Sequence, residues 1–208
     1  METTVAEFEK AVGREAAAFD LTLSQSQIQR LTDYYALVMK WNARLHLTAP
    51  CSPQEFATRH ILESLLLLKH LPPKASFIDV GSGAGLPAIP CLLARDDLTA
   101  TLIESSKKKG VFLNEALRAV RPSGRAHLIV ARFEEVALPS ANFLTCRALD
   151  RFSETLPTMI QWASPDTTFL LFAGDNVRQR IDSLFSDVRF ELIPQSNQRF
   201  LIIARARR

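Results

Sequence analysis

The sequence predicts an α/β fold with a mostly parallel sheet, an N-terminal helical extension and an antiparallel C-terminal hairpin. Three observations support this prediction. Residues 1 to about 70 show helical periodicity, short apolar runs alternate with helical stretches from residue 75 onward, and a short turn-rich link separates the last two apolar runs. Alternating strands and helices are typical of βαβ units, whose strands are parallel and whose helices cover the sheet.

The N-terminal third is expected to be helical. Behind Ser24, a residue type that caps helix N-termini, apolar side chains recur at three-and-four spacing: Ile28, Leu31, Tyr35, Val38 and Leu45. A second helix is expected from Ser52-Pro53, because proline is favoured at the first helical position, and Pro72-Pro73 ends it. We expect residues 1–72 to be an extension packed on a core of residues 73–208, within one structural domain.

Five apolar runs in the core are strand candidates, and helical stretches lie between them. The strands are expected at 77–80, 99–104, 126–130, 142–146 and 168–172, and the helices at 87–95, 107–120 and 152–163. Two further strands, 188–193 and 199–206, flank Pro194-Gln195-Ser196-Asn197. Strands joined by so short a link must be antiparallel. The chain is therefore expected to finish in an antiparallel hairpin.

Composition narrows the class of protein. The net charge of +3 is too small to indicate a nucleic-acid partner by itself. Cys51, Cys91 and Cys146 lie far apart without CxxC pairing, so we expect a reducing compartment, no disulfide framework and no metal site. The N-terminus lacks the apolar core of a signal peptide, and no apolar run approaches a membrane span. We expect a cytoplasmic protein.

Basic residues are clustered although the net charge is small. The clusters are Lys107, Lys108 and Lys109; Arg118, Arg121 and Arg125; and Arg205, Arg207 and Arg208. Such clusters can bind the phosphate backbone of a nucleic acid. On charge alone, a solvated helix face and a frayed terminus are the better explanation.

A glycine-rich loop follows the first core strand. Gly81, Gly83 and Gly85 stand where this strand turns into its helix, at the edge where open α/β sheets bind ligands. The dinucleotide fingerprint read from Gly81 fails at Leu86, and a match read from Gly83 shifts the strand by two residues. Pro87 also lacks an amide hydrogen for a pyrophosphate. The loop favours a ligand that needs close contact without a phosphate, such as S-adenosylmethionine.

Three further residues fit a nucleoside. Glu104 ends the second strand about twenty residues beyond the loop, where an acid can accept both ribose hydroxyls. This acid would serve NAD equally well. After the third strand, Phe133 could pack near an adenine ring while Glu134 addresses its amino edge. Alternatively, Glu134 is a helix-start acid that complements the helix dipole.

Four motifs together resemble a known family. They are K-W-N-x-x-x-x-L-T at Lys40 to Thr48, R-H-I-L-E-S at Arg59 to Ser64, D-V-G-S-G-A-G-L-P-A-I-P at Asp79 to Pro90, and C-R-A at Cys146 to Ala148. From about residue 28 to the C-terminus the sequence is similar to the bacterial small-subunit ribosomal RNA guanine-N7 methyltransferases, historically called glucose-inhibited division protein B. The family usually shows S-R-A for C-R-A.

The resemblance implies a class I (Rossmann-like) methyltransferase fold and methylation of N7 of a guanine in 16S ribosomal RNA near the decoding site. It implies S-adenosyl-L-methionine as cofactor and small-subunit ribosomal RNA or the ribosomal subunit as partner. Apart from the resemblance, we expect no membrane or metal and a monomer. By position, the cofactor contacts fall on Gly81, Gly83, Leu86, Glu104, Phe133 and Glu134, with Arg147 at the active-site edge. His46 replaces a usual Asn and Ala173 a usual Lys, so contacts with RNA differ from the family pattern.

The chemistry needs no general base, because guanine N7 already carries an in-plane lone pair. Positioning should supply most of the acceleration. We expect Arg147 to hold O6, a phosphate or the methionine carboxylate; the alternative is a surface ion pair with Asp150. Arg59 is expected to reach RNA. A buried Cys146 and packed His60, Trp41 and Trp162 are favoured over catalytic or stacking roles for these residues.

Three alternatives remain at the level of sequence. The first is a methyltransferase acting on another RNA or on a small molecule; activity on a small molecule should survive neutralisation of Lys107 to Lys109 and the arginine tail. The second is a nicotinamide oxidoreductase, which should bind NAD and ignore S-adenosylmethionine. The third is a cofactor-binding protein without catalysis.

Overall fold

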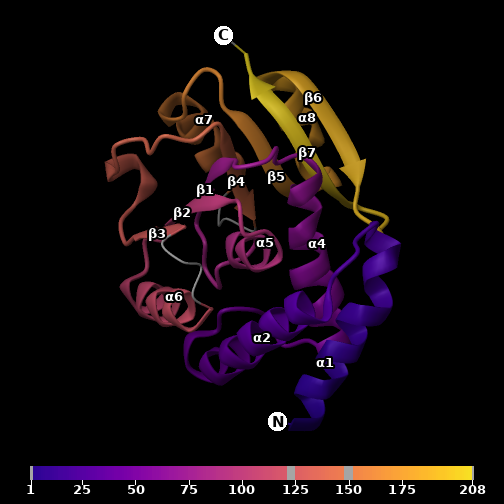
Figure 1. Cartoon of the computed structure of the whole chain (residues 1–208). Coiled ribbons are helices and arrows are strands. Elements are labelled where there is room, and N and C mark those ends of the chain that lie inside the picture. The colour runs from indigo at the N-terminus through magenta and orange to yellow at the C-terminus, as the bar shows by residue number, and fades with distance from the viewer. Residues whose placement is uncertain (1, 121–124, 148–151, 208) are drawn as a thin grey trace.

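The computed structural model describes residues 2–120, 125–147 and 152–207. They form a seven-stranded sheet in the order β3-β2-β1-β4-β5-β7-β6 (Figure 1). The strands are β1 (Ser76–Val80), β2 (Thr99–Ile103), β3 (Ala126–Ile129), β4 (Phe143–Arg147), β5 (Thr168–Gly174), β6 (Phe185–Leu192) and β7 (Arg199–Ala206). Strands β1 to β5 pair in parallel, whereas β7 runs antiparallel to both β5 and β6. The predicted parallel sheet and its terminal hairpin are confirmed.

Helices occupy the positions that the apolar periodicity predicts, with two additions. The extension contains α1 (Glu2–Glu15), the 3₁₀ turn η1 (Ala16–Phe19), α2 (Gln25–Leu45), α3 (Pro53–Phe56), the π-helical turn η2 (Ala57–Leu62), α4 (Glu63–Leu65) and the 3₁₀ turn η3 (Leu66–Lys69). The core contains α5 (Ala88–Ala94), α6 (Lys107–Val120), η4 (Phe133–Glu135), α7 (Phe152–Trp162), η5 (Asp175–Val177) and α8 (Arg178–Leu184). The π-helical turn and the short α8 were not predicted, because each is too short to show a period of its own.

The predicted helix starts in the extension are confirmed at atomic level. The hydroxyl of Ser24 accepts a hydrogen bond from the amide of Gln27 at 3.3 Å, and the Gln27 side chain accepts one from the Ser24 amide at 2.7 Å. This reciprocal pair is a capping box. The hydroxyl of Ser52 caps α3 by accepting a hydrogen bond from the Glu55 amide at 3.1 Å, with Pro53 at the start of the helix.

Two hydrophobic cores lie on opposite faces of the sheet. Along β5, Leu170 and Phe172 point into the core that contains the extension, α5 and α6, whereas Phe169 and Leu171 point into the core that contains α7 and α8. This alternation follows from the two-residue period of a strand. Figure 1 shows the helical extension gathered at one side of the sheet, around α4 and α5.

The chain order of the strands reverses between β1 and β4. β1 lies between β2 and β4, and Val80 at its end is paired with Cys146, the residue before Arg147. The carboxyl ends of these strands therefore meet at a topological switch point, where open α/β sheets form ligand crevices. The glycine loop and Arg147 share this edge.

Candidate functional site

The glycine loop is fastened to the end of β2. The amides of Gly81 and Ser82 donate to the carbonyl of Ile103 at 2.9 and 3.2 Å. Gly81, Gly83 and Gly85 have φ angles of 72°, 56° and 83°, in the left-handed region that favours glycine. The loop therefore needs glycines to take this path, as the sequence predicts.

Two of these glycines differ in what surrounds them. A Cβ on Gly83 would meet only the Gly81 carbonyl, at 3.7 Å, so the space beside Gly83 is open to a ligand. A Cβ on Gly85 would stand 2.8 Å from Cγ1 of Ile89, inside the packing of α5. Gly83 allows a ligand to approach the backbone, whereas Gly85 allows the loop to pack on its own helix.

Glu104 and Gly83 are brought together as the sequence predicts. The Glu104 side chain is buried, and its Oε2 accepts a hydrogen bond from the Gly83 amide at 2.8 Å while its Oε1 accepts one from the Ser106 amide at 2.7 Å. A carboxylate oxygen has two acceptor sites, so each oxygen keeps capacity for a ribose hydroxyl. The carboxylate thus shapes the loop and remains able to bind a ligand.

Asp79 is a buried acid that the sequence analysis did not single out, although it begins the quoted glycine motif. It is fully buried in β1, and neither carboxylate oxygen has a hydrogen-bond partner among the described residues. Its pKa is raised to about 8, chiefly by burial and also by the charge of Glu104, against the opposing effect of the nearby Ser82 hydroxyl. An orphaned acid beneath the loop is what a cationic ligand in this crevice would complement.

The residues predicted to contact the adenine, Phe133 and Glu134, lie in η4, which follows β3. Phe133 is 6% exposed and meets Trp162 edge-on, with ring centroids 5.4 Å apart. The indole of Trp162 donates to the Val136 carbonyl at 2.8 Å, so this tryptophan is a packed residue as expected. Glu134 is exposed and pairs with Arg132 at 3.0 Å, and Leu86 is 7% exposed. A role for these three residues in cofactor binding stays a prediction.

The Arg147 side chain is mostly buried, at 13% exposed, and contacts the extension. Its Nη2 lies 3.0 Å from Oε2 of Glu63 and also donates to the carbonyl of Arg59. Its Nη1 lies 3.5 Å from the Ser64 hydroxyl, and its guanidinium carbon lies 5.3 Å from the centroid of the Phe172 ring. Asp150, the partner considered from sequence, falls outside the described residues. The second partner of Glu63 is Arg199, whose Nη1 lies 2.5 Å from Oε1.

His60 and Cys146 are unsuited to acid–base or nucleophilic chemistry, as expected. The pKa of His60 is lowered to about 3, chiefly by burial and also by the charges of Arg147 and Arg59. The imidazole therefore stays neutral beside the ring of Phe56, at 4.8 Å between centroids. Cys146 is fully buried in β4.

The basic residues fall into different places. The first turn of α6, near the glycine-loop edge, consists of Lys107, Lys108 and Lys109. Cations at a helix N-terminus interact unfavourably with the helix dipole, so these lysines do not stabilise the helix. Arg59 is half exposed and pairs with Glu55 at 2.5 Å. The register Thr168↔Arg205 places Arg205 at the amino edge of the sheet, away from the loop.

Of the remaining arginines in the predicted clusters, Arg207 and Arg125 make structural contacts, and Arg118 is exposed on α6. Arg207 donates to the carbonyls of Phe185 and Asp182, at 2.8 and 3.0 Å. Arg125 donates to the carbonyls of Arg95 and Leu98, at 3.0 and 3.1 Å. Arg121 and Arg208 fall outside the described residues.

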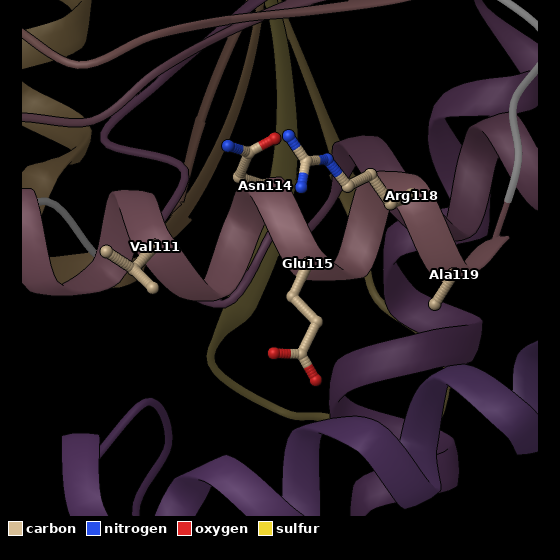
Figure 2. A pocket seen from close by; sticks show the side chains of 5 residues that line it. All are labelled: Val111, Asn114, Glu115, Arg118 and Ala119. Carbon is tan, nitrogen blue, oxygen red and sulfur yellow. The ribbon is translucent and has the colours of Figure 1, made fainter.

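A shallow groove runs along α6. Figure 2 shows the five residues that line it: Val111, Asn114, Glu115, Arg118 and Ala119. Glu115 points toward α2, where Nζ of Lys40 lies 3.8 Å from its carboxylate. None of the residues predicted to bind the cofactor lines it.

Comparison with known proteins identifies the family. The family model described as GidB, rRNA small subunit methyltransferase G, matches residues 27–203. The chain belongs to the rRNA small subunit methyltransferase G family. The resemblance seen in the sequence is confirmed, and the chain is a methyltransferase that uses S-adenosylmethionine.

Individual relatives agree over most of their length. Ribosomal RNA small subunit methyltransferase G of Rhizobium meliloti (strain 1021) is 30% identical, over 85% of this chain and 86% of the relative. The protein of the same name from Xanthomonas axonopodis pv. citri (strain 306) is 37% identical, over 74% of this chain and 72% of the relative.

Solved structures share the fold of this family member. A Streptococcus agalactiae protein of the NADB-Rossmann superfamily has a TM-score of 0.57 at 15% identity, covering 69% of this chain and 68% of its own. M. jannaschii TYW2, solved in complex with AdoMet, has a TM-score of 0.55 at 13% identity, covering 71% and 74%. The predicted class I, Rossmann-like architecture is confirmed.

One family motif and one departure from the family pattern have structural explanations. In K-W-N-x-x-x-x-L-T, the Asn42 amide donates to the Thr48 carbonyl at 3.1 Å and its oxygen accepts from the Thr48 amide at 2.9 Å, which closes the end of α2. His46 caps this helix at φ 47°, a left-handed position that asparagine adopts readily, so the departure from the family's Asn is conservative for the backbone. Ala173 pairs with Phe200, one residue from Arg199.

The residues present fit S-adenosylmethionine. The open space beside Gly83 and the carboxylate of Glu104 offer room and ribose acceptors to a cationic nucleoside. Asp79, which is protonated below about pH 8 in the free protein, would be ionised by a cation bound nearby. Within 2–120, 125–147 and 152–207, no group of three or more His, Cys, Asp or Glu residues could hold a metal ion. No helix in the described part of the chain is long and apolar enough to cross a membrane.

Proposed function

We propose that this enzyme transfers a methyl group from S-adenosylmethionine to N7 of a guanine in small-subunit (16S) ribosomal RNA. One observation carries the proposal: the family match runs from α2 through the glycine loop to β7, and so spans the extension and hairpin that flank the site as well as the cofactor core. The relatives' names, which specify small-subunit ribosomal RNA, support this substrate.

The cofactor is proposed to lie across the carboxyl ends of β1 and β2. The cofactor would lie against the backbone of Gly81, Gly83 and Leu86, and Glu104 would accept hydrogen bonds from its ribose. Gly85 supports this arrangement through its packing against Ile89. The adenine is proposed to lie toward η4, between Phe133 and Glu134.

Arg147 is proposed to position the substrate or the methionine end of the cofactor. Bound S-adenosylmethionine supplies an electrophilic methyl group on a sulfonium sulfur. The chain has to hold the guanine base in line with that group, and no residue has to remove a proton from N7. The neutral His60 agrees with such a site. Orientation of the base is then the main source of acceleration.

The RNA is proposed to cross the edge where α6 begins. Lys107, Lys108 and Lys109 would contact phosphates there, and Arg59 would extend the positive surface from the extension. We propose a monomer in the cytoplasm, where ribosomal RNA is made. Residues 1–72 are proposed to act as a fixed extension of the 73–208 core, because both contribute to one hydrophobic core.

The test uses small-subunit RNA and 30S subunits from cells that lack the modification. The protein is incubated with labelled S-adenosylmethionine and each substrate, and N7-methylguanine is mapped by chemical cleavage of the RNA. We expect label in a single guanine and strand scission at that position. Methylation at another atom of the base would overturn the N7 assignment, and transfer to no RNA would overturn the substrate.

A further inference from the structure

One buried carboxylate joins two arginines that come from distant strands. Glu63, in α4 of the extension, is 2% exposed. Its Oε2 lies 3.0 Å from Nη2 of Arg147 at the end of β4, and its Oε1 lies 2.5 Å from Nη1 of Arg199 at the start of β7. The extension therefore reaches into the core at the edge where the substrate is proposed to bind.

The helix is locally widened at this contact. Residues Ala57–Leu62 form a π-helical turn, in which the Glu63 amide bonds to the Thr58 carbonyl five residues back. The next carbonyl, that of Arg59, accepts a hydrogen bond from Arg147. Interruptions of this kind occur frequently at functional sites, where the ladder of helical hydrogen bonds admits a side chain.

Stability alone does not account for the trio. Burial lowers the pKa of Arg147, and Glu63 opposes this by favouring the charged guanidinium. Burial likewise raises the pKa of Glu63, whereas the charges of Arg147 and Arg199 lower it. Well-packed apolar side chains generally stabilise a fold at least as well as such a buried ionic group does. What this ionic group adds is a fixed orientation of the Arg147 and Arg199 side chains, whose positive charges would otherwise repel each other.

We infer that Glu63 is a positioning residue for the methyl-transfer reaction, which rests on the proposed function. Its carboxylate holds Arg147 and Arg199 as a pair at the carboxyl edge of the sheet, ready for the polar groups of the target nucleotide. Arg147 is 13% exposed and is held on several sides, whereas the Arg199 side chain is 31% exposed. Without the carboxylate, the two guanidinium groups repel each other and lose their common anchor.

The test compares Glu63→Gln, Glu63→Asp and Glu15→Gln. Glu15 is the matched control, because it is also a carboxylate of the extension and also contacts the hairpin, through Gln195 at 2.9 Å. For Glu63→Gln we expect kcat/KM for RNA to fall about 10- to 100-fold, while the Kd for S-adenosylmethionine stays within about twofold. Glu63→Asp keeps the charge on a shorter side chain, so we expect an intermediate activity. Glu15→Gln should match the wild-type protein.

A second measurement does not depend on RNA. In ¹⁵N-arginine-labelled protein, assigned with Arg147→Lys, we expect the Nε–Hε signal of Arg147 to move toward that of exposed arginines in Glu63→Gln and to stay in place in Glu15→Gln. If the wild-type protein methylates no guanine N7, the proposed function fails, but this signal still tests the role of Glu63.

Two results would overturn the inference. The first is a Glu63→Gln variant whose activity and Arg147 signal match those of the wild-type protein. The second is a Glu63→Gln variant whose activity falls only by the fraction of protein that unfolds. If Glu63→Gln does not fold, Glu63→Asp decides the question: wild-type activity together with an unmoved Arg147 signal would show that anchoring both arginines is unnecessary.

Discussion

The hydroxyl of Tyr34 in α2 donates a hydrogen bond to the carbonyl of Ala84 in the glycine loop. Both residues are buried. Burial raises the pKa of Tyr34, and the charge of Asp79 raises it further, so the hydroxyl keeps its proton and remains a donor. The helical extension thus holds one side of the loop, while Ile103 and Glu104 hold the other.

Tyr34→Phe should therefore weaken cofactor binding. Removing the hydroxyl leaves a buried carbonyl without its partner, which costs about 1–3 kcal/mol of the free energy of unfolding. Because the loop can relax only by leaving its binding shape, we expect the Kd for S-adenosylmethionine to rise roughly tenfold, as measured by calorimetry. Tyr35→Phe is the control, since this neighbouring buried ring stacks on Phe8. Equal Kd values for the two variants would contradict the prediction.

Gly83→Ala and Gly85→Ala should fail in different ways. Both positions have positive φ, so alanine costs about 1–2 kcal/mol at either one. At Gly83 the added methyl group enters the open space beside the loop, and we expect cofactor binding to be lost while the protein stays folded. At Gly85 it collides with Ile89, and we expect a larger loss of thermal stability. Calorimetry and thermal melts of both variants separate the two effects; the reverse pattern would show that the open space is not the binding space.

Asp79→Asn should change how stability depends on pH. With a folded pKa of about 8 and an unfolded value of about 4, Asp79 binds a proton only in the folded state between these limits. Its contribution to stability therefore falls as pH rises through that window. We expect the Tm of Asp79→Asn, relative to the wild-type protein without cofactor, to increase steadily from pH 5 to pH 8.

The control for this pH series is Asp97→Asn. Hydrogen bonds from Arg95 hold the pKa of Asp97 well below its usual range, so this acid is ionised in both folded and unfolded states from pH 5 to pH 8. Its removal should shift Tm by the same amount at every pH. A constant shift for Asp79→Asn as well would show that Asp79 is already ionised in the folded protein.

Neutralising the lysines of α6 should reduce the salt dependence of RNA binding. Each phosphate contact contributes roughly 0.7–0.9 to the slope of log K against log salt, so changing Lys107, Lys108 and Lys109 to Gln should lower the magnitude of that slope by up to about 2–3. Thermal stability should not fall, because cations at a helix N-terminus oppose its dipole. The double variant of Arg205 and Arg207, at the amino edge of the sheet, should change the slope less. Filter binding over a salt series measures both, and an unchanged slope for the lysine variant would remove α6 from the RNA interface.

Local signals made most of the fold predictable. The two-residue period marks the strands, the 3.6-residue period marks the longer helices, and Ser24 marks the start of α2 by its capping chemistry. The glycine loop and Glu104 could also be found, because each follows a strand of the parallel sheet and such strand ends converge on one edge. The short helix α8 was missed because two turns with few apolar residues carry no clear period.

The order of the elements, the place of the cofactor loop and the family could be predicted from the amino-acid sequence, because these depend on residues close together in the chain. The pairing of Glu63 with Arg147, 84 positions away, and with Arg199 on the antiparallel strand β7 became visible only in the folded protein. It likewise placed Arg199 at the site edge and Arg205 at the opposite edge. A charged residue in an amphipathic pattern looks the same whether it meets water or a buried partner, and only long-range packing and strand register determine which of the two it meets.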